Sequence, residues 1–212
     1  MKKYAFILII LFSCQEKTET KTNSVPEQKP ATSVEATVPV PEETAQQKWQ
    51  DFYQRQDPSF QPEKFIAQPK SEINYRDDES PILPDQDFNR IYQPFLVFSP
   101  DRSQYIDFDS YHWQLYDGNA SFEADQKAVL VNMNSKTSRQ IAFFGPSYRI
   151  EEAYWKNNHQ AVLLGNTYEK VPFFIEYDFI ENTQQFFQYS DTLKTDETYG
   201  DFRLESKGIG TN

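Results

Sequence analysis

Aromatic residues are distributed very unevenly along this chain, which contains 3 Trp, 13 Tyr and 18 Phe in 212 residues. Three of them, Tyr4, Phe6 and Phe12, precede residue 46, and all the others fall in residues 46–212. This density predicts a single folded head domain with a substantial hydrophobic core. Residues 15–45 contain four prolines and neither an aromatic residue nor a glycine. Such a segment buries too little apolar surface to offset its ordering entropy, so we expect a disordered tether.

The N-terminus has the layout of a secretory signal, which we place at residues 1–13. A basic start, Met1-Lys2-Lys3, precedes an apolar run from Ala5 to Phe12. This run is too short to span a bilayer, which takes about 20 apolar residues. Because it ends at Cys14, it resembles the signal peptide of a bacterial lipoprotein, in which the cysteine receives acyl chains and becomes the first mature residue. The resemblance implies lipidation at Cys14 and a membrane contact through the lipid anchor.

The residue after that cysteine indicates which of the two membranes, inner or outer, would hold the anchor. Gln15 stands where the family's inner-membrane retention signal often places Asp. We therefore expect an outer-membrane protein, with residues 14–45 as lipidated cysteine and tether and residues 46–212 as the head.

Composition argues against several functional classes. The net charge of −11 disfavours nucleic acid as a partner, because an acidic surface repels phosphate backbones. Once Cys14 is acylated, no thiol remains for a disulfide or a thiolate metal site. No G-x-S-x-G elbow or glycine-rich phosphate loop is present, and His112 and His159 are the two histidines. We expect a non-enzymatic protein without a cofactor or metal.

The head is predicted to begin with a short helix followed by an irregular segment. Thr44 and Gln47 have the spacing of a capping box, and Trp49, Phe52 and Tyr53 form one apolar stripe. Asp57-Pro58 ends the helix. Six prolines punctuate residues 58–94, which we call the wrap and expect to be ordered, extended and poor in regular structure.

Two successive units of short strands follow the wrap. In the first, residues 95–98, the alternating segment around Ile106 and Phe108, and residues 128–133 and 140–144 are the predicted strands. In the second they are residues 150–155, 161–164, 173–177 and 186–189. Turn-forming residues separate the strands.

The first turn, Phe98-Ser99-Pro100-Asp101-Arg102, resembles the aromatic-Ser-Pro-Asp-Gly turn of PD40-type β-propeller blades. The segment Trp155-Lys156-Asn157-Asn158-His159 occupies the equivalent place in the second unit. Arg102 replaces the usual glycine, and an inserted loop at 110–126 interrupts the first unit. Because a propeller needs at least four blades, we expect a mainly β fold of antiparallel, blade-like four-stranded units that is not a closed propeller. The two sheets either pack face to face or join into one bent sheet.

The inserted loop supplies the candidate ligand-binding residues Tyr111, Trp113 and Tyr116. Aromatic residues at strand spacing usually belong to a core, but loops on a rigid scaffold often carry binding residues. A platform of Tyr111 and Trp113 would stack against sugar rings. We therefore expect the head to bind an envelope protein or a glycan through this loop or through the wrap.

Three alternatives remain open. A polysaccharide hydrolase would use Asp107 or Asp109 with Glu123 as acid and base. A purely structural subunit of an envelope assembly would expose a large apolar patch. The acidic residues between Asp101 and Asp125 lack the spacing of a dedicated calcium loop and most simply form a solvated acidic edge.

Overall fold

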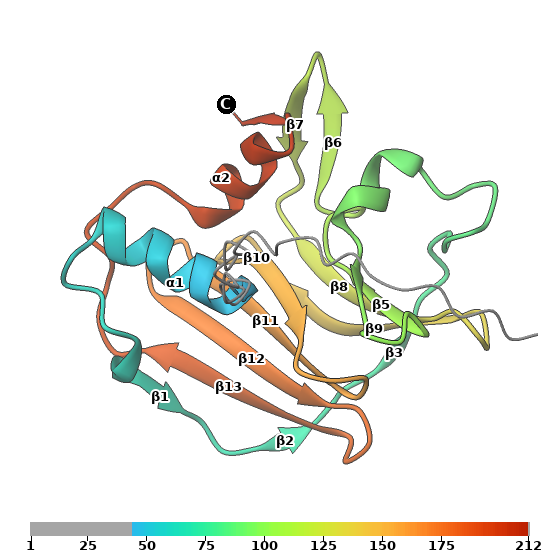
Figure 1. Ribbon diagram of the computed structural model, residues 1–212, viewed down its shortest axis with the longest axis horizontal. Helices are drawn as coiled ribbons and strands as arrows, with labels where there is room; N and C mark the ends of the chain where they lie inside the picture. Colours follow the sequence, from blue (N-terminus) through green and yellow to red (C-terminus); the bar gives the residue numbers. More distant parts are fainter. Residues whose placement is uncertain (1–43, 212) are drawn as a thin grey trace, which may run out of the picture. The chain divides into compact units, whose positions relative to one another are not determined.

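The computed structural model describes residues 44–211, which belong to one compact unit (Figure 1). Helix α1 (Ala45–Gln56) begins as predicted, because the Thr44 hydroxyl accepts from the Gln47 N–H and the Gln47 side chain accepts from the Thr44 N–H. Its apolar stripe is buried, with Trp49 and Tyr53 fully inaccessible. The helix ends at Asp57, as the Asp-Pro pair predicts. Cys14 and most of the predicted tether lie outside the described residues.

The second predicted unit forms an antiparallel meander. Its four strands lie in the sheet in chain order, and each pairs with the next. They are β10 (Tyr148–Trp155), β11 (Gln160–Thr167), β12 (Pro172–Asp178) and β13 (Thr183–Tyr189). We call this sheet A. The β10–β11 register shifts between Ile150 and Glu152, so Glu151 is the extra residue of a bulge.

The first predicted unit forms sheet B, also antiparallel, in the order β3-β9-β8-β5-β4. Its members are β3 (Arg76–Asp77), β4 (Val97–Phe98), β5 (Gln104–Asp107), β8 (Gln126–Asn132) and β9 (Thr137–Phe144). The inserted loop between β5 and β8 folds into a hairpin of β6 (Trp113–Tyr116) and β7 (Asn119–Phe122). This hairpin projects from the rest of the fold (Figure 1).

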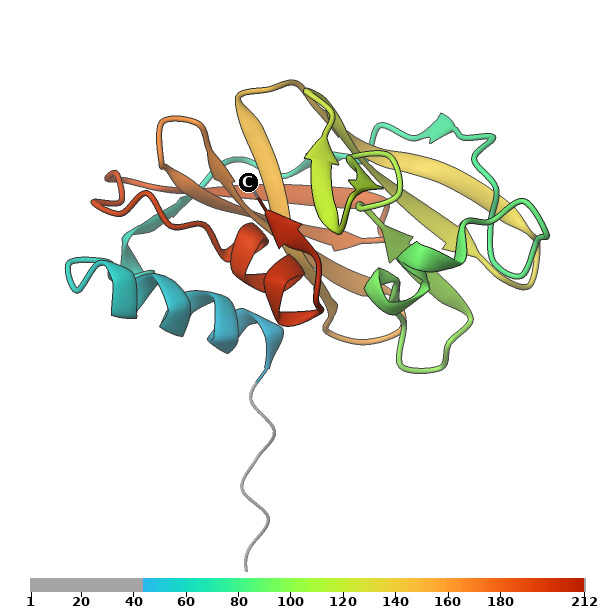
Figure 2. The same ribbon diagram turned by 90° about the horizontal axis from the view of Figure 1, so that it is seen from above.

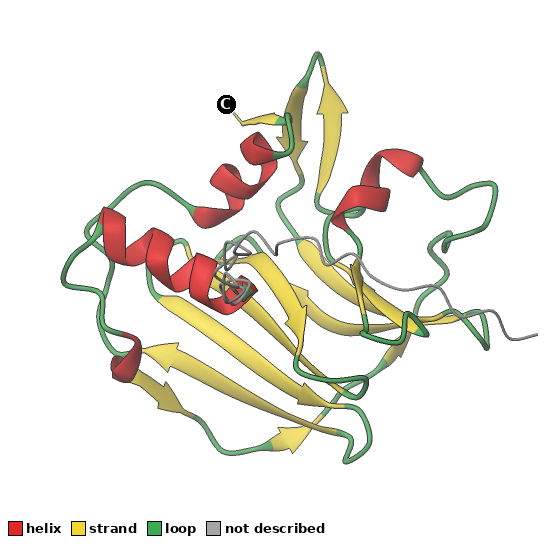
Figure 3. Cartoon of the chain, in the orientation of Figure 1, coloured by secondary structure: helices red, strands yellow, loops and turns green. Residues whose placement is uncertain are grey.

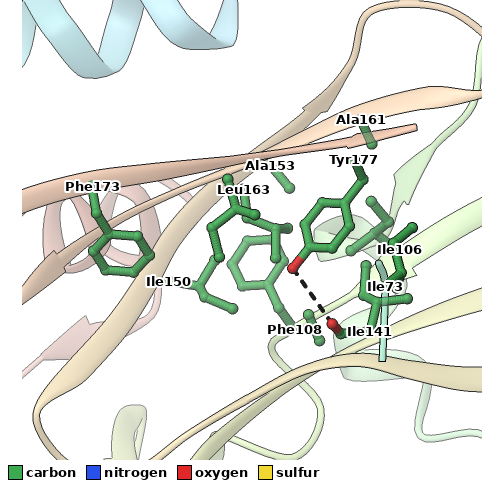
Figure 4. Packing of buried hydrophobic residues seen from close by; sticks show 12 residues of the cluster. Ile73, Ile106, Phe108, Ile141, Ile150, Ala153, Ala161, Leu163, Phe173 and Tyr177 are labelled. Atoms are coloured by element: carbon green, nitrogen blue, oxygen red, sulfur yellow. Dashed lines mark hydrogen bonds between the residues drawn. The ribbon is translucent and has the colours of Figure 1, made fainter. Parts of the chain in front are cut away.

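The two sheets pack face to face through the principal core. Ile106, Phe108 and Ile141 of the sheet B unit contact a cluster of sheet A residues that includes Leu163 and Phe173 (Figure 4). Figure 3 shows that strands dominate the described chain. The predicted mainly β fold with blade-like units is confirmed, and face-to-face packing decides between the two arrangements that the sequence left open.

Helices cover the outer face of sheet A. Helix α1 packs on Val162 and Leu164, and a second helix, α2 (Tyr199–Ser206), lies on the same side (Figure 2). No sequence pattern predicted α2. A terminal strand, β14 (Gly210–Thr211), pairs in parallel with β7. The outer face of sheet B is covered by the 3₁₀-helix η2 (Arg90–Phe95) and by Leu204 of α2.

The wrap runs from the edge of sheet A to the edge of sheet B. After the 3₁₀-helix η1 (Pro62–Lys64), β1 (Phe65–Ala67) and β2 (Ser71–Glu72) both pair with β13, and β3 pairs with β9. Ile73, which is 4% exposed, enters the core between the sheets. The wrap is thus extended as predicted, with regular structure only in these short pieces and in η2 at its end.

Two backbone positions explain local sequence choices. A Cβ at Gly165 would lie 2.3 Å from the Arg149 carbonyl oxygen and 2.5 Å from the Phe173 ring, so the close approach of these elements requires glycine. Arg102 has a φ of 56°, in the left-handed region that usually favours glycine. Its guanidinium lies 4.1 Å from the centroid of the Phe98 ring, a contact that glycine lacks.

Candidate functional site

The structure separates the three predicted ligand-binding residues. Tyr111 is 43% exposed and Tyr116 is 79% exposed, whereas Trp113 is fully buried. The predicted platform of Tyr111 and Trp113 is therefore wrong. The Trp113 indole N–H donates to Asp109 at 2.8 Å, and its ring packs edge-on against two neighbouring aromatic rings, those of Tyr92 and Phe95.

Asp107 and Asp109 are the acid or base candidates of the hydrolase alternative. Both are buried, Asp107 at the end of β5 and Asp109 two residues beyond it. The Asp107 carboxylate accepts from the backbone N–H groups of Asp109 and Ser110, and Asp109 forms a buried ion pair with Arg203 at 2.6 Å. Burial raises the pKa of Asp107. These partners assign both carboxylates to structural roles, so the hydrolase hypothesis gains no support from them.

The remaining polar candidates do not converge either. Glu123 is exposed after β7, His112 is buried, and His159 is exposed in the β10–β11 turn. Asp101 accepts hydrogen bonds from Ser103 within its own turn. Within residues 44–211 there is no group of three or more His, Cys, Asp or Glu side chains placed to hold a metal ion.

A cleft of about 320 Å³ lies between the two sheets on the side that the wrap crosses. β9 contributes residues 140–144 to its lining, and β12 and β13 contribute two residues each. The wrap contributes the remaining residues, which are Gln68, Pro69, Ser71, Asn74 and Arg76. We call it the wrap cleft. Its volume lies within the range of small-molecule sites, roughly 300 to 1,000 Å³. The pairing of β3 with β9 covers only Arg139 and Gln140, which leaves the following residues of β9 open to the cleft.

Aromatic side chains provide the apolar part of the wrap cleft. Tyr177 and Phe186 come from sheet A, and Phe143 and Phe144 come from β9. Phe143 is 47% exposed, a large fraction for a phenylalanine beside a cleft. The Tyr177 hydroxyl reaches the Ile141 carbonyl oxygen at 3.5 Å across the two sheets (Figure 4), and burial raises the Tyr177 pKa. Tyr177 therefore serves as a neutral group at this site.

The polar part of the wrap cleft consists mainly of neutral amides. These are the side chains of Gln68, Asn74, Gln140 and Gln184. Among the described residues that line the cleft, Arg76 alone carries a charge. The cleft is thus nearly neutral although the whole chain carries a net charge of −11.

Sequence reasoning identified the wrap as a possible binding segment but missed the cleft itself. The cleft combines wrap residues with β9, β12 and β13, which lie about 70 to 110 positions later in the chain. A clustering of amides in the proline-rich wrap, with Gln68 and Asn74 close to Pro69, was the available signal.

Comparisons of this chain with protein-family profiles, with curated proteins and with solved structures gave no match. Among residues 44–211, no helix has both the length and the apolar character needed to cross a membrane.

Proposed function

We propose that this chain is a cell-envelope lipoprotein whose head binds a neutral glycan in the wrap cleft without chemically altering it. The observation that carries the proposal is the lining of the cleft, which combines aromatic side chains with neutral amides. Sugar rings have apolar faces that stack on aromatic rings, and their hydroxyl groups exchange hydrogen bonds with amides. The near absence of charge favours a neutral sugar over an acidic one.

The anchor rests on the sequence. Cys14 follows an apolar run with a basic start, and the acidic surface gives the head little attraction to anionic lipid. More than one acyl chain is needed for durable attachment, which lipoproteins of this type supply. Metabolic labelling with a radioactive fatty acid tests this part. We expect label in the natural chain and none in Cys14→Ser, and equal label in both would refute the anchor.

Glycan binding is tested by screening the full chain on an array of neutral and acidic oligosaccharides, followed by calorimetry with the strongest neutral binder. Phe143→Ala should weaken binding about tenfold, because loss of one aromatic contact costs about 1.4 kcal/mol. Phe202→Ala is the matched control, since Phe202 is also 47% exposed but lies on α2. Phe143→Ala binding with unchanged affinity, or an array that retains only acidic sugars, would refute the cleft as a neutral-glycan site.

Prolonged incubation with the bound glycan, followed by mass spectrometry, tests the absence of catalysis. We expect the oligosaccharide to be recovered intact. New reducing ends that appear with the natural chain would establish a hydrolase instead.

A second candidate is a protein contact at the β6–β7 hairpin. Tyr111, Leu115, Tyr116 and Phe122 are all at least 37% exposed there, and three consecutive residues of β6 are exposed on both of its faces. Apolar groups exposed together are typical of an interaction surface. A photo-crosslinking amino acid at position 116 should capture an envelope protein in intact cells, and the same probe at the exposed Tyr168 should not capture that protein.

A further inference from the structure

A second cavity of about 320 Å³ lies on the other side of sheet A from the principal core. It is formed by the start of β10, the end of β11 and the loop that leads into α2. We call it the α2 pocket. Glu151 and Asn166 reach it from adjacent strands, and these side chains are 0% and 7% exposed. Tyr168, which follows the end of β11, also lines it.

Glu151 is already provided with donors from the protein. Its carboxylate accepts from the Trp49 indole N–H at 2.8 Å and from the Tyr53 hydroxyl at 2.7 Å. The Gly200 N–H contributes a longer contact of 3.4 Å. Burial raises the Glu151 pKa, and these hydrogen bonds oppose that rise. Glu151 therefore joins α1, β10 and α2.

Asn166 is not fully paired. Its Nδ2 donates weakly to the Tyr53 hydroxyl at 3.4 Å, and its Oδ1 has no hydrogen-bond partner among the described residues. Turning the amide over does not remove the problem, because the single Tyr53 hydroxyl proton is already donated to Glu151. An unpaired buried acceptor costs about 1 to 3 kcal/mol. A hydrogen-bond donor bound in the α2 pocket beside Asn166 Oδ1 would remove this cost.

The donors of the pocket wall are already occupied. At the start of α2, the Tyr199 N–H donates to the Tyr53 hydroxyl at 3.3 Å, and the Asp201 N–H donates to the Thr198 hydroxyl at 3.2 Å. The Gly200 N–H faces Glu151. An anion therefore finds no free backbone donor among these three at this helix N-terminus.

The two cations of the pocket wall are also paired with carboxylates. Arg149 bonds Asp201 at 2.9 Å, and Lys170 bonds Asp196. The exposed Glu197 adds a further negative charge to the lining. With Glu151 at the buried end, the carboxylates around the pocket outnumber the cations, which favours a positively charged ligand.

We propose that the α2 pocket binds a small ligand bearing a primary ammonium group, with that group donating to Asn166 Oδ1 beside Glu151. An ammonium has three donors and no acceptor, which matches the unpaired oxygen. The face of Tyr168 suits the organic part of the ligand and attracts its charge. This site is separate from the wrap cleft and does not depend on glycan binding.

The test titrates the full chain with 2-phenylethylamine, and with 3-phenylpropionate as a probe of opposite charge and similar size. Binding is followed by NMR through the side-chain amide of Asn166 and the backbone amides of residues 195–198. We expect saturable shifts with the amine in the millimolar range and none with the carboxylate. Saturation of the same signals by the carboxylate at equal or lower concentration would overturn the proposal.

Substitutions then locate the donor contact. Asn166→Ala should weaken amine binding at least tenfold, while Asn134→Ala, in an exposed turn, should leave it unchanged. Amine binding within twofold of the natural chain by a folded Asn166→Ala variant would refute the site. If Asn166→Ala does not fold, Tyr168→Ala decides, since Tyr168 is 84% exposed and its removal spares the core. At least threefold weakening supports the site, and unchanged affinity refutes it.

Discussion

Replacing Arg203 by Met should destabilise the head severely. The Arg203–Asp109 pair is 2.6 Å long, and the two side chains are 8% and 2% exposed. Removal of the guanidinium leaves a buried carboxylate whose remaining side-chain donor is the Trp113 indole. Breaking such a pair from one side costs about 3 to 5 kcal/mol. Because a domain is stable by only about 5 to 15 kcal/mol, this is a large part of the total.

Urea denaturation of the full chain at pH 7, followed by tryptophan fluorescence, measures the effect. With a slope of about 2 kcal/mol/M, a loss of about 4 kcal/mol lowers the midpoint by about 2 M. Lys64→Met is the control, because the Lys64–Asp191 pair is 3.9 Å long with side chains 38% and 62% exposed. An exposed pair of this kind contributes about 1 kcal/mol at most.

A double variant separates the cost of the unpaired Asp109 carboxylate from the cost of losing the packing contacts of Arg203. Asp109→Asn together with Arg203→Met removes both charges and should be more stable than Arg203→Met alone, since no unpaired carboxylate remains. The reasoning fails if Arg203→Met lies within about 1 kcal/mol of the natural chain. It fails equally if the double variant is the less stable of the two.

Two further predictions concern close packing and pH. Gly165→Ala should cost more than about 2 kcal/mol in urea denaturation because the new Cβ overlaps backbone, while Gly145→Ala, whose Cβ has no neighbour nearer than 3.8 Å, should cost far less. Burial and the nearby Arg149 lower the His112 pKa from 6.5 to about 4, so this histidine supports the fold above pH 6.5 and the support is lost as pH falls. Between pH 7 and 5 the free energy of unfolding should fall by about 2 kcal/mol because of this histidine. His112→Gln should abolish this fall, and His159→Gln should retain it. Equal pH dependence of unfolding in the two variants would contradict the assignment.

Local patterns predicted the local structure well. The capping box at Thr44, the buried stripe beginning at Trp49 and the stop at Asp57 all depend on neighbours within one or two helical turns. The two units of four strands followed from turn residues and apolar runs. Helix α2 was missed because its sequence, YGDFRLES, has no clear apolar stripe, and its buried residues belong to two different cores.

The sites depended on contacts that the sequence alone does not encode in any short pattern. Alternation around Ile106 and Phe108 predicted a strand, but it could not show that Asp109 is buried beside Arg203, 94 positions later. Trp113 was assigned to a ligand surface because it lies in the inserted loop, but it is buried and donates to Asp109. The amide lining of the wrap cleft and the unpaired oxygen of Asn166 became visible only when distant strands were brought together.

The convergence of α1, β10 and α2 on Glu151 also has a kinetic side. Tyr53 and Tyr199 meet there although 146 positions separate them. Chains whose native contacts join such remote positions fold slowly, because the entropy of closing long loops is lost before the contacts contribute favourable free energy. A ribosome would release nearly the entire polypeptide before this junction closes, and slow folding of this kind is compatible with the export of an unfolded chain that the proposed lipid anchor requires.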